Sequence, residues 1–321
     1  MNLLTFPRAA LVASALLVLT PLFVPGWIIF IITKALFLSI AVMGVAVLLR
    51  GGLLTFGHAL YYATGAYAVG FSVKWLGIHE LLLLIPLGAL AGLAMAALVG
   101  LIMARYREVF FAMLNLAFSM MLFGALLKFY NITGGSDGLT IGTATLFGAE
   151  LEPDSFGFYY FSLAIVGIVS FVVCRFMASP LGYFLRALHD NEIRMEYSGV
   201  AVRQVVYKTY LLAGTLGGVS GVLAAFAIGH IVPEDAFWIQ SGEFVFVALL
   251  GGFGGVPGPL MGALVFEFIQ TYASKYFPLA WQMTLGIIML VVILFQPGGL
   301  WAIYKKVEQR LGQKGKGDED G

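Results

Sequence analysis

Long apolar runs constrain this sequence more than any other feature. Of its 321 residues, 60% are hydrophobic and 11% are charged, whereas a soluble domain carries about 25% charged residues. The apolar residues gather in runs of about 20, the length that an α-helix needs to cross the hydrocarbon core of a bilayer. Backbone polar groups in that core must be satisfied within the protein, which favours helices. The chain is therefore predicted to be an all-α, polytopic transmembrane bundle, with possible broken or re-entrant helices.

Ten runs are candidate spans, and they form one predicted membrane domain over residues 1–307. They cover residues 9–25, 27–49, 56–76, 81–103, 109–128, 158–177, 207–229, 242–255, 257–276 and 279–297. The first run also resembles a cleavable signal peptide. A retained span is favoured, because Pro21, Pro25 and Gly26 look like a turn. The final segment, 308–321, is rich in glycine and charge and is predicted to be a disordered cytoplasmic tail.

The distribution of lysine and arginine predicts which loops face the cytoplasm. With the N-terminus inside and ten crossings, 14 of the 18 basic residues lie in inside loops. The four that remain outside are Lys34, Lys74, Lys128 and Lys275. The outer loops are instead acidic, with Asp137, Glu150, Glu152, Asp154, Glu234 and Asp235. Both termini are thus predicted to be cytoplasmic, and residues 129–157 and 230–241 to face outward.

One strongly polar segment, residues 179–208, interrupts the apolar pattern; we call it the polar island. Its charges are costly in lipid, and the predicted topology places it in the cytoplasm, where a soluble partner could dock. The pattern predicts a helix from near Tyr183 to Gly199, with Phe184, Leu185 and Leu188 on one face and Arg186, Asp190 and Arg194 on the other. A second short amphipathic stretch is expected over 202–207. The alternative is a plain solvated interfacial helix.

Two glycine-rich segments cannot run as uninterrupted helix. They are residues 51–58, which lead into Gly65, and residues 251–259. At membrane depth such backbone is tolerated only when it is buried in protein or lines a cavity, and paired breaks mark the transport route in repeat-built transporters. The candidate path residues are Thr55, Gly57, His58, Gly65, Tyr67, Gly254 and Gly255. Two cytoplasmic hairpin turns packed through small residues are an equally good interpretation.

Several chemistries are disfavoured by what the sequence lacks. It contains neither a GxxxxGK[ST] phosphate-binding loop nor an HExxH or paired CxxC motif. Its four histidines are scattered and its single cysteine, Cys174, excludes an intrachain disulfide. Its basic residues lie at span ends rather than in a patch. We therefore expect no enzyme, no cofactor, no metal site and no nucleic-acid partner. Glu267 is the only deep carboxylate, which makes a proton-driven carrier less favoured.

Four blocks in series resemble the branched-chain amino acid ABC permeases of the LivM type. The polar island matches at Ser179, Pro180, Gly182, Arg186, Ala187, Asp190, Asn191, Glu192 and Gly199, although Tyr197-Ser198 departs from the family pattern. The other blocks are Thr55–Ala59 with Gly65-Ala66-Tyr67, then Asn131–Leu139, then Phe295–Leu300. Together they run in order from residue 51 to residue 300.

The resemblance implies a permease subunit of an ATP-binding cassette importer for leucine, isoleucine and valine in the bacterial inner membrane. Its partners would be a second, LivH-like permease, two cytoplasmic LivG/LivF-like ATPases that hydrolyse ATP on separate chains, and a periplasmic substrate-binding protein, with membrane lipid around the bundle. The polar island would be the ATPase-coupling segment, through Arg186, Asp190, Asn191, Glu192, Arg194, Glu196 and Gly199. Gly134, Gly135, Asp137 and Gly138 are candidate contacts of the binding protein, with Asp137 also a candidate helix cap. The alternatives are an ABC permease for urea or short amides, and a secondary transporter or channel for a small solute.

Overall fold

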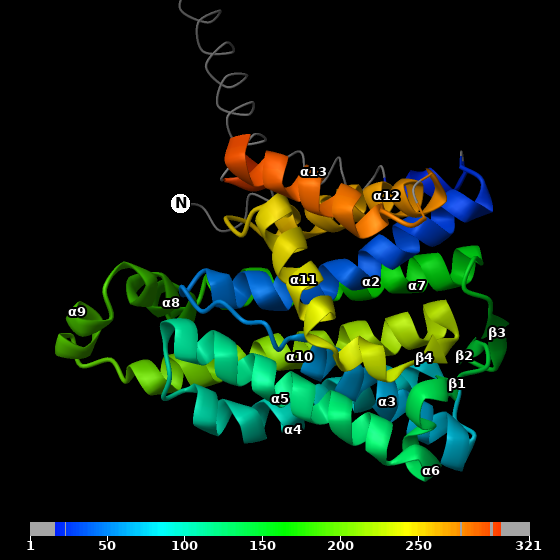
Figure 1. The fold of residues 1–321 in the computed structure, drawn as a ribbon, viewed down its shortest axis with the longest axis horizontal. Coiled ribbons are helices and arrows are strands. Elements are labelled where there is room, and N and C mark those ends of the chain that lie inside the picture. The colour runs from blue at the N-terminus through cyan, green and yellow to red at the C-terminus, as the bar shows by residue number, and fades with distance from the viewer. Residues whose placement is uncertain (1–16, 23, 277, 296–297, 303–321) are drawn as a thin grey trace, which may run out of the picture.

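A computed structural model describes residues 17–22, 24–276, 278–295 and 298–302. Most of its long helices lie roughly along one common axis, which α11 crosses (Figure 1). The long helices are α2 (Gly26–Leu49), α3 (Ala59–Leu76), α4 (Leu81–Met103), α5 (Glu108–Lys128), α7 (Phe156–Met177), α10 (Val202–Ile228), α11 (Trp238–Gly251), α12 (Pro257–Tyr276) and α13 (Trp281–Phe295). The predicted all-α bundle is confirmed.

Short elements gather at the two ends of this bundle. One end carries α8 (Pro180–Asp190) and α9 (Glu192–Tyr197), which project beyond the long helices (Figure 1). The other end carries α6 (Tyr130–Thr133), the 3₁₀ turn η2 (Gly135–Asp137) and four short strands, and from it η3 (Pro233–Ala236) reaches back to Ser119 in the middle of α5. β1 (Leu139–Thr140) pairs antiparallel with β4 (His230–Ile231), and β2 (Ala144–Leu146) forms a hairpin with β3 (Ala149–Leu151). A further 3₁₀ turn, η1 (Thr20–Leu22), precedes α2. The polar island and the acidic loops therefore lie at opposite ends of the molecule.

Each predicted span from 27–49 onward contains a helix, but residues 56–58 and 252–255, which were assigned to two of the spans, are non-helical. Within the described residues, α2, α4, α5, α7 and α10 are long and apolar enough to cross a membrane. α11 and α13 are apolar but shorter, and α3 and α12 carry more polar residues. Residues 9–16 and 23 of the first predicted span, 9–25, lie outside the described residues, and so does the whole predicted tail, 308–321.

The centre of the bundle is α10, which packs against α2, α3 and α4. Glycines permit this close approach: a Cβ added at Gly92 would lie 3.0 Å from the Gly218 Cα, and one added at Gly65 only 2.6 Å from the same atom. Small residues let helix backbones meet in membranes, where van der Waals packing drives association. The candidate path residue Gly65 is thus a packing position between α3 and α10.

Candidate translocation and coupling sites

The first glycine-rich segment enters the bundle as extended chain between α2 and α3. Residues 53–58 are non-helical, and Leu53, Thr55, Gly57 and His58 are buried. The segment is held internally, because the Thr55 hydroxyl accepts a hydrogen bond from the Gly57 amide at 3.2 Å. α3 starts only at Ala59, whose amide donates to Ser241 Oγ of α11 at 2.9 Å. The break therefore lies inside the protein, the setting in which irregular backbone is tolerated at membrane depth.

Middle portions of four helices surround this break. A Cβ at Gly57 would come within 2.9 Å of the Asn115 Cβ of α5, and one at Gly44 of α2 would come within 2.8 Å of the His58 ring. The same ring lies 3.3 Å from a Cβ built at Gly217 of α10, and its centroid is 6.1 Å from that of Phe244 in α11. Neither ring nitrogen of His58 has a hydrogen-bond partner among the described residues.

A buried polar chain continues from this break across α3, α10 and α5. The Tyr61 hydroxyl donates to the Tyr210 hydroxyl, which donates to Asn115 Oδ1. The Asn115 amide donates to the Phe111 carbonyl at 2.8 Å. A satisfied buried network of this kind fixes the relative position of its helices. The other candidate on α3, Tyr67, is buried with a hydroxyl that lacks a partner among the described residues.

The polar island rests directly on the turn that opens the break. Leu185 and Leu188 of α8 are buried as predicted. A Cβ at Gly51 would overlap the Leu185 side chain, and one at Gly52, whose φ is +72°, would lie 3.0 Å from His189 Nδ1. A displacement of α8 would therefore also displace the Gly51-Gly52 turn, which lies six residues before His58. This contact joins two features that the sequence presents separately.

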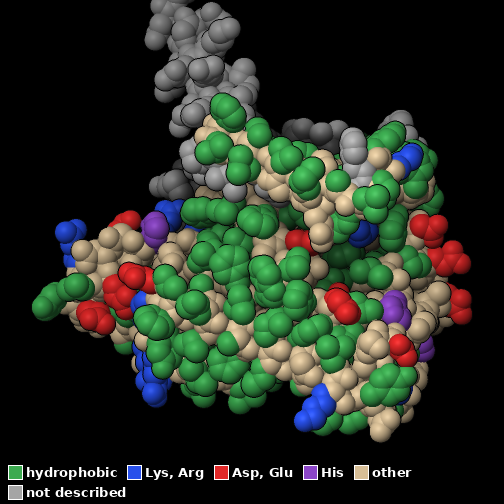
Figure 2. All heavy atoms as spheres, in the orientation of Figure 1, with side chains coloured by type: hydrophobic (Ala, Val, Ile, Leu, Met, Phe, Trp, Pro, Cys, Tyr) green, Lys and Arg blue, Asp and Glu red, His purple; other side chains and the backbone are tan. Residues whose placement is uncertain are grey.

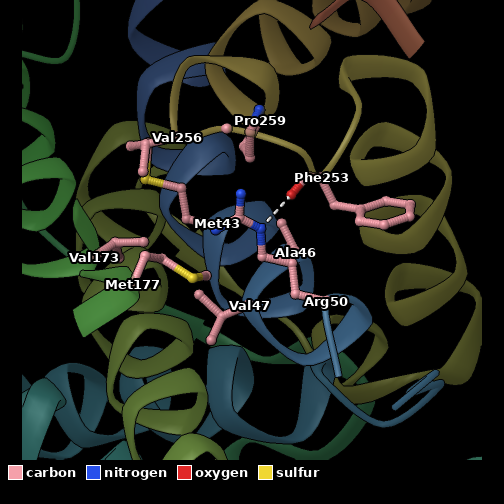
Figure 3. A pocket seen from close by; sticks show the side chains of 10 residues that line it. Met43, Ala46, Val47, Arg50, Val173, Met177, Phe253, Val256 and Pro259 are labelled. Atoms are coloured by element: carbon pink, nitrogen blue, oxygen red, sulfur yellow. Dashed lines mark hydrogen bonds between the residues drawn. The ribbon is translucent and has the colours of Figure 1, made fainter. Parts of the chain in front are cut away.

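The second glycine-rich segment is tied to the same turn through Arg50. Its Nε donates to the Phe253 carbonyl at 2.9 Å, and its guanidinium also donates to the Gly254 carbonyl. Figure 3 shows Arg50 reaching from the end of α2 to this loop, beside an apolar pocket lined by Met43, Val47 and Met177. Burial and the neighbouring Arg186 lower the pKa of Arg50 to about 10, so the guanidinium remains charged at neutral pH.

The candidates Gly254 and Gly255 lie under the Trp301 indole. A Cβ at Gly254 would come within 2.9 Å of its Cδ1, and one at Gly255 within 2.6 Å of its Cζ2. Gly252, with φ +85°, and Gly299, with φ +67°, pack backbone against backbone beside them. The second break is therefore partly covered by the segment that follows α13, with Gly255 half-buried against Trp301 and Gly254 still exposed.

The predicted single helix of the polar island is wrong in two respects. It begins at Pro180, since proline is well suited to the first helical position, and it breaks at Asn191, which has extended backbone. Asn191 Oδ1 accepts from the Arg194 amide at 2.9 Å and so starts α9. Asp190 and Glu192 consequently flank a bend rather than occupy the middle of a helix. The stretch 202–207 is the first part of α10 rather than a separate helix.

The island's coupling candidates are placed differently from one another. Glu192 pairs with Arg107, in the turn before α5, at 3.0 Å between Oε1 and Nε. Exposed side chains occupy the remaining positions: Arg186, Asp190, Asn191, Arg194 and Glu196. Gly199 ends the island with φ +80°. The apolar face also stops at the bend, since Ile193 is exposed and Met195 is the buried residue of α9.

Three left-handed glycines shape the external loop. Gly134, Gly135 and Gly138 have φ values of +80°, +56° and +68°, which disfavour any residue with a Cβ. A Cβ at Gly138 would lie 3.1 Å from His230 Nε2. Asp137 does not cap a helix as one prediction suggested: its Oδ2 accepts from the Tyr130 hydroxyl at 2.8 Å, which raises the pKa of that tyrosine.

Asp235 is the other structured carboxylate at this end. Its Oδ2 accepts from the Val232 amide at 3.2 Å and holds the η3 turn. Burial raises its pKa to about 6, against the opposing effect of that hydrogen bond.

One charged cluster escaped prediction as a site. Lys34 Nζ of α2 lies 3.0 Å from Glu267 Oε2 of α12, and the Glu267 side chain is 5% exposed. Glu243 of α11 lies within electrostatic range of both. The signal in the sequence was ionisable residues inside apolar runs, which are functional candidates by default. Within the described residues, no group of three His, Cys, Asp or Glu side chains could hold a metal ion.

Known proteins place this architecture in a family. Residues 27–294 match the model of the family described as "Branched-chain amino acid transport system / permease component". The chain is 26% identical over 272 residues to the permease protein LivM of Escherichia coli K12. The aligned region makes up 78% of this chain and 64% of that protein. It is 27% identical over 238 residues to a probable LivM of Methanocaldococcus jannaschii, covering 70% and 69%.

Permease proteins named LivH are also related to this chain. LivH of Salmonella typhimurium is 25% identical over 270 residues, which cover 78% of this chain and 85% of LivH. No solved structure matches the chain. With the family match spanning most of the described helices, the chain belongs to the permease components of the branched-chain amino acid transport systems, and it is a multi-pass membrane protein.

Proposed function

We propose that this chain is the permease subunit of an ATP-driven importer that carries leucine, isoleucine and valine across the bacterial inner membrane. The observation that carries the proposal is the seating of α8 on the Gly51-Gly52 turn. A cytoplasmic ATPase that moved α8 would act on the buried segment 53–58 through the contact of α8 with the Gly51-Gly52 turn. Coupling requires contacts that differ between two states of the motor, and this turn is placed to transmit such a difference.

The partners that we propose can each be assigned a surface of this arrangement. Two cytoplasmic ATPases would bind the exposed side of α8 and α9, and a periplasmic binding protein would dock on the end that carries α6 and the β2–β3 hairpin. A second, LivH-like permease would complete the membrane part. Both termini would be cytoplasmic. The names LivM and LivH of the relatives support branched-chain amino acids as the cargo.

Uptake by the complete importer tests this function. Proteoliposomes that contain both permeases and the ATPases, with ATP inside and the loaded binding protein outside, should accumulate labelled leucine. Uptake of urea or a short amide without uptake of leucine would instead support the alternative cargo. Uptake without ATP would favour a secondary transporter or channel.

The orientation has an independent test in intact cells. A single cysteine at position 190, in a Cys174→Ser background, should resist membrane-impermeant maleimide, whereas one at position 147 of the external hairpin should react. Phe147 is 85% exposed, so its label is not limited by burial. Strong labelling at 190 would contradict the proposed orientation.

A further inference from the structure

We propose that Lys34, Glu243 and Glu267 form a transient binding site for the ammonium and carboxylate groups of an α-amino acid on its way through the bundle. The inference rests on the proposed function and assigns residues to the passage itself. The three side chains come from α2, α11 and α12, which pack against one another. Figure 2 shows acidic and basic side chains around a recess beside the α12–α13 layer.

This cluster is poorly explained as an ion pair that only stabilises the fold. In a low-dielectric interior, the cost of removing two charges from water offsets much of their mutual attraction, so a buried ion pair is weak evidence of a stabilising role. Here Lys34 pairs with Glu267 alone, and Glu243 lies within electrostatic range without an ion pair, so the cluster holds two carboxyl groups and one ammonium. Glu243 has only the Gln240 amide as a hydrogen-bond partner among the described residues, at 3.4 Å. Such an unbalanced set suits a ligand that supplies a cation.

The second step is unmet hydrogen-bonding capacity beside the cluster. Glu267 is 4% exposed, and its Oε2 approaches Lys34 without a well-directed hydrogen bond. Tyr62 of α3 is 6% exposed and lies within electrostatic range of Glu267 and Glu243. Buried polar groups normally have partners, so Glu267 Oε2 is the atom in this cluster that indicates a polar guest.

The third step is the chemistry of the guest. At neutral pH an α-amino acid carries one ammonium and one carboxylate. Its carboxylate can replace Glu267 on Lys34, and its ammonium can then bridge the released Glu267 and Glu243. Every charge keeps an opposite partner during this exchange, so the cluster avoids an unpaired buried charge. Phe244, whose ring centroid is 5.4 Å from that of Tyr62, provides apolar surface nearby for a branched side chain.

The site lies towards the external end of the bundle. Lys34 is in the third turn of α2, whose N-terminus lies near the strands, and Glu243 is in the second turn of α11, directly after η3. A zwitterion released by an external binding protein would therefore meet Lys34 first, and Glu243 would hold it beside the buried break, since Ser241 and Phe244 of α11 contact Ala59 and His58.

The test uses the complete importer in proteoliposomes and reports labelled leucine taken up per ATP hydrolysed. Glu243→Gln keeps the shape of the side chain and breaks no ion pair that the structure shows. It should lower this ratio by about tenfold or more, because a hydrogen bond to a charged group is lost. A double variant, Lys34→Gln/Glu267→Gln, removes both charges of the pair and should lower the ratio similarly. The matched control is Glu234→Gln, an exposed carboxylate on η3, which should retain the wild-type ratio.

The outcomes separate the inference from the function on which it rests. Wild-type leucine uptake together with a wild-type ratio in Glu243→Gln would overturn the binding site and leave the proposed function intact. If the double variant fails to assemble with its partners, the Glu243→Gln result alone decides. Absence of leucine uptake by the wild-type importer would instead refute the proposed function.

Discussion

The ion pair between Arg107 and Glu192 predicts how the polar island reaches α5. Arg107 Nε and Glu192 Oε1 are 3.0 Å apart, with side chains 22% and 33% exposed. An ion pair so accessible to solvent contributes about 0.2–1 kcal/mol. If the pair transmits motion from α9 to the start of α5, its loss should slow ATP hydrolysis stimulated by the binding protein by a factor of about 1.4 to 5.

A double-mutant cycle measures this contribution in the reconstituted importer. Glu192→Ala and Arg107→Ala should each lower stimulated hydrolysis and uptake within that range, and the double variant should lower them no further than either single one. Glu196→Ala provides the comparison, because Glu196 is exposed on the same helix without an ion pair in the described residues, so any loss there reports contact with the ATPase rather than with α5.

Two results would refute this reasoning. Additive effects of the two substitutions would show that the residues act independently. A loss above about 30-fold in Glu192→Ala, with Arg107→Ala near wild type, would show that Glu192 is a direct contact of the ATPase, since truncating one member of a desolvated charge pair across an interface costs about 2–5 kcal/mol.

Three further predictions concern the glycine loop and the external end. Gly255→Leu should abolish assembly or uptake, because its side chain would collide with the Trp301 indole, and Gly255→Leu/Trp301→Ala should regain part of the lost complex in a co-purification assay. Asp137→Asn should preserve the fold, since an amide oxygen can still accept from Tyr130; a large loss of uptake by a normally assembled importer would then support a contact with the binding protein. The pKa of Asp235 is raised from 3.8 to about 6, so the folded state binds more protons than the unfolded one between these values, and the η3 region should lose stability as the pH rises from about 4 to 6. Hydrogen exchange around Trp238 should show this trend, and Asp235→Asn should remove it.

The helices were predictable because backbone polar groups in the bilayer core must be hydrogen-bonded within the protein, so long apolar runs form helices. Apolar runs set the bounds of α4 and α12 to the residue, and the lysine and arginine bias separated the two ends. Local signals failed where a polar side chain competes with the backbone. At Asn191, the spacing of Arg186, Asp190 and Arg194 favoured one helix, yet the Asn191 side chain caps a second one.

Contacts between distant parts of the chain were the larger gap. Lys34 and Glu267 are far apart in sequence, and so are Arg50 and Phe253. A single sequence shows that such charges are unusual in apolar runs but not which partner each one meets. The same holds for Gly51, where the identity of its neighbour, Leu185, depends on the path of α8 over the end of α2.

The start of α3 has a consequence for the order in which this protein can be made. The Ala59 amide is satisfied by Ser241, 182 residues further along the chain. At a synthesis rate of about 5–20 residues per second, the ribosome needs roughly 10–40 s to deliver that serine. During this interval the segment from Gly51 to Ala59 lacks the helix that will cover it. We therefore expect the Gly51–Ala59 segment to reach its final packing only after α11 has emerged, as a late step of maturation.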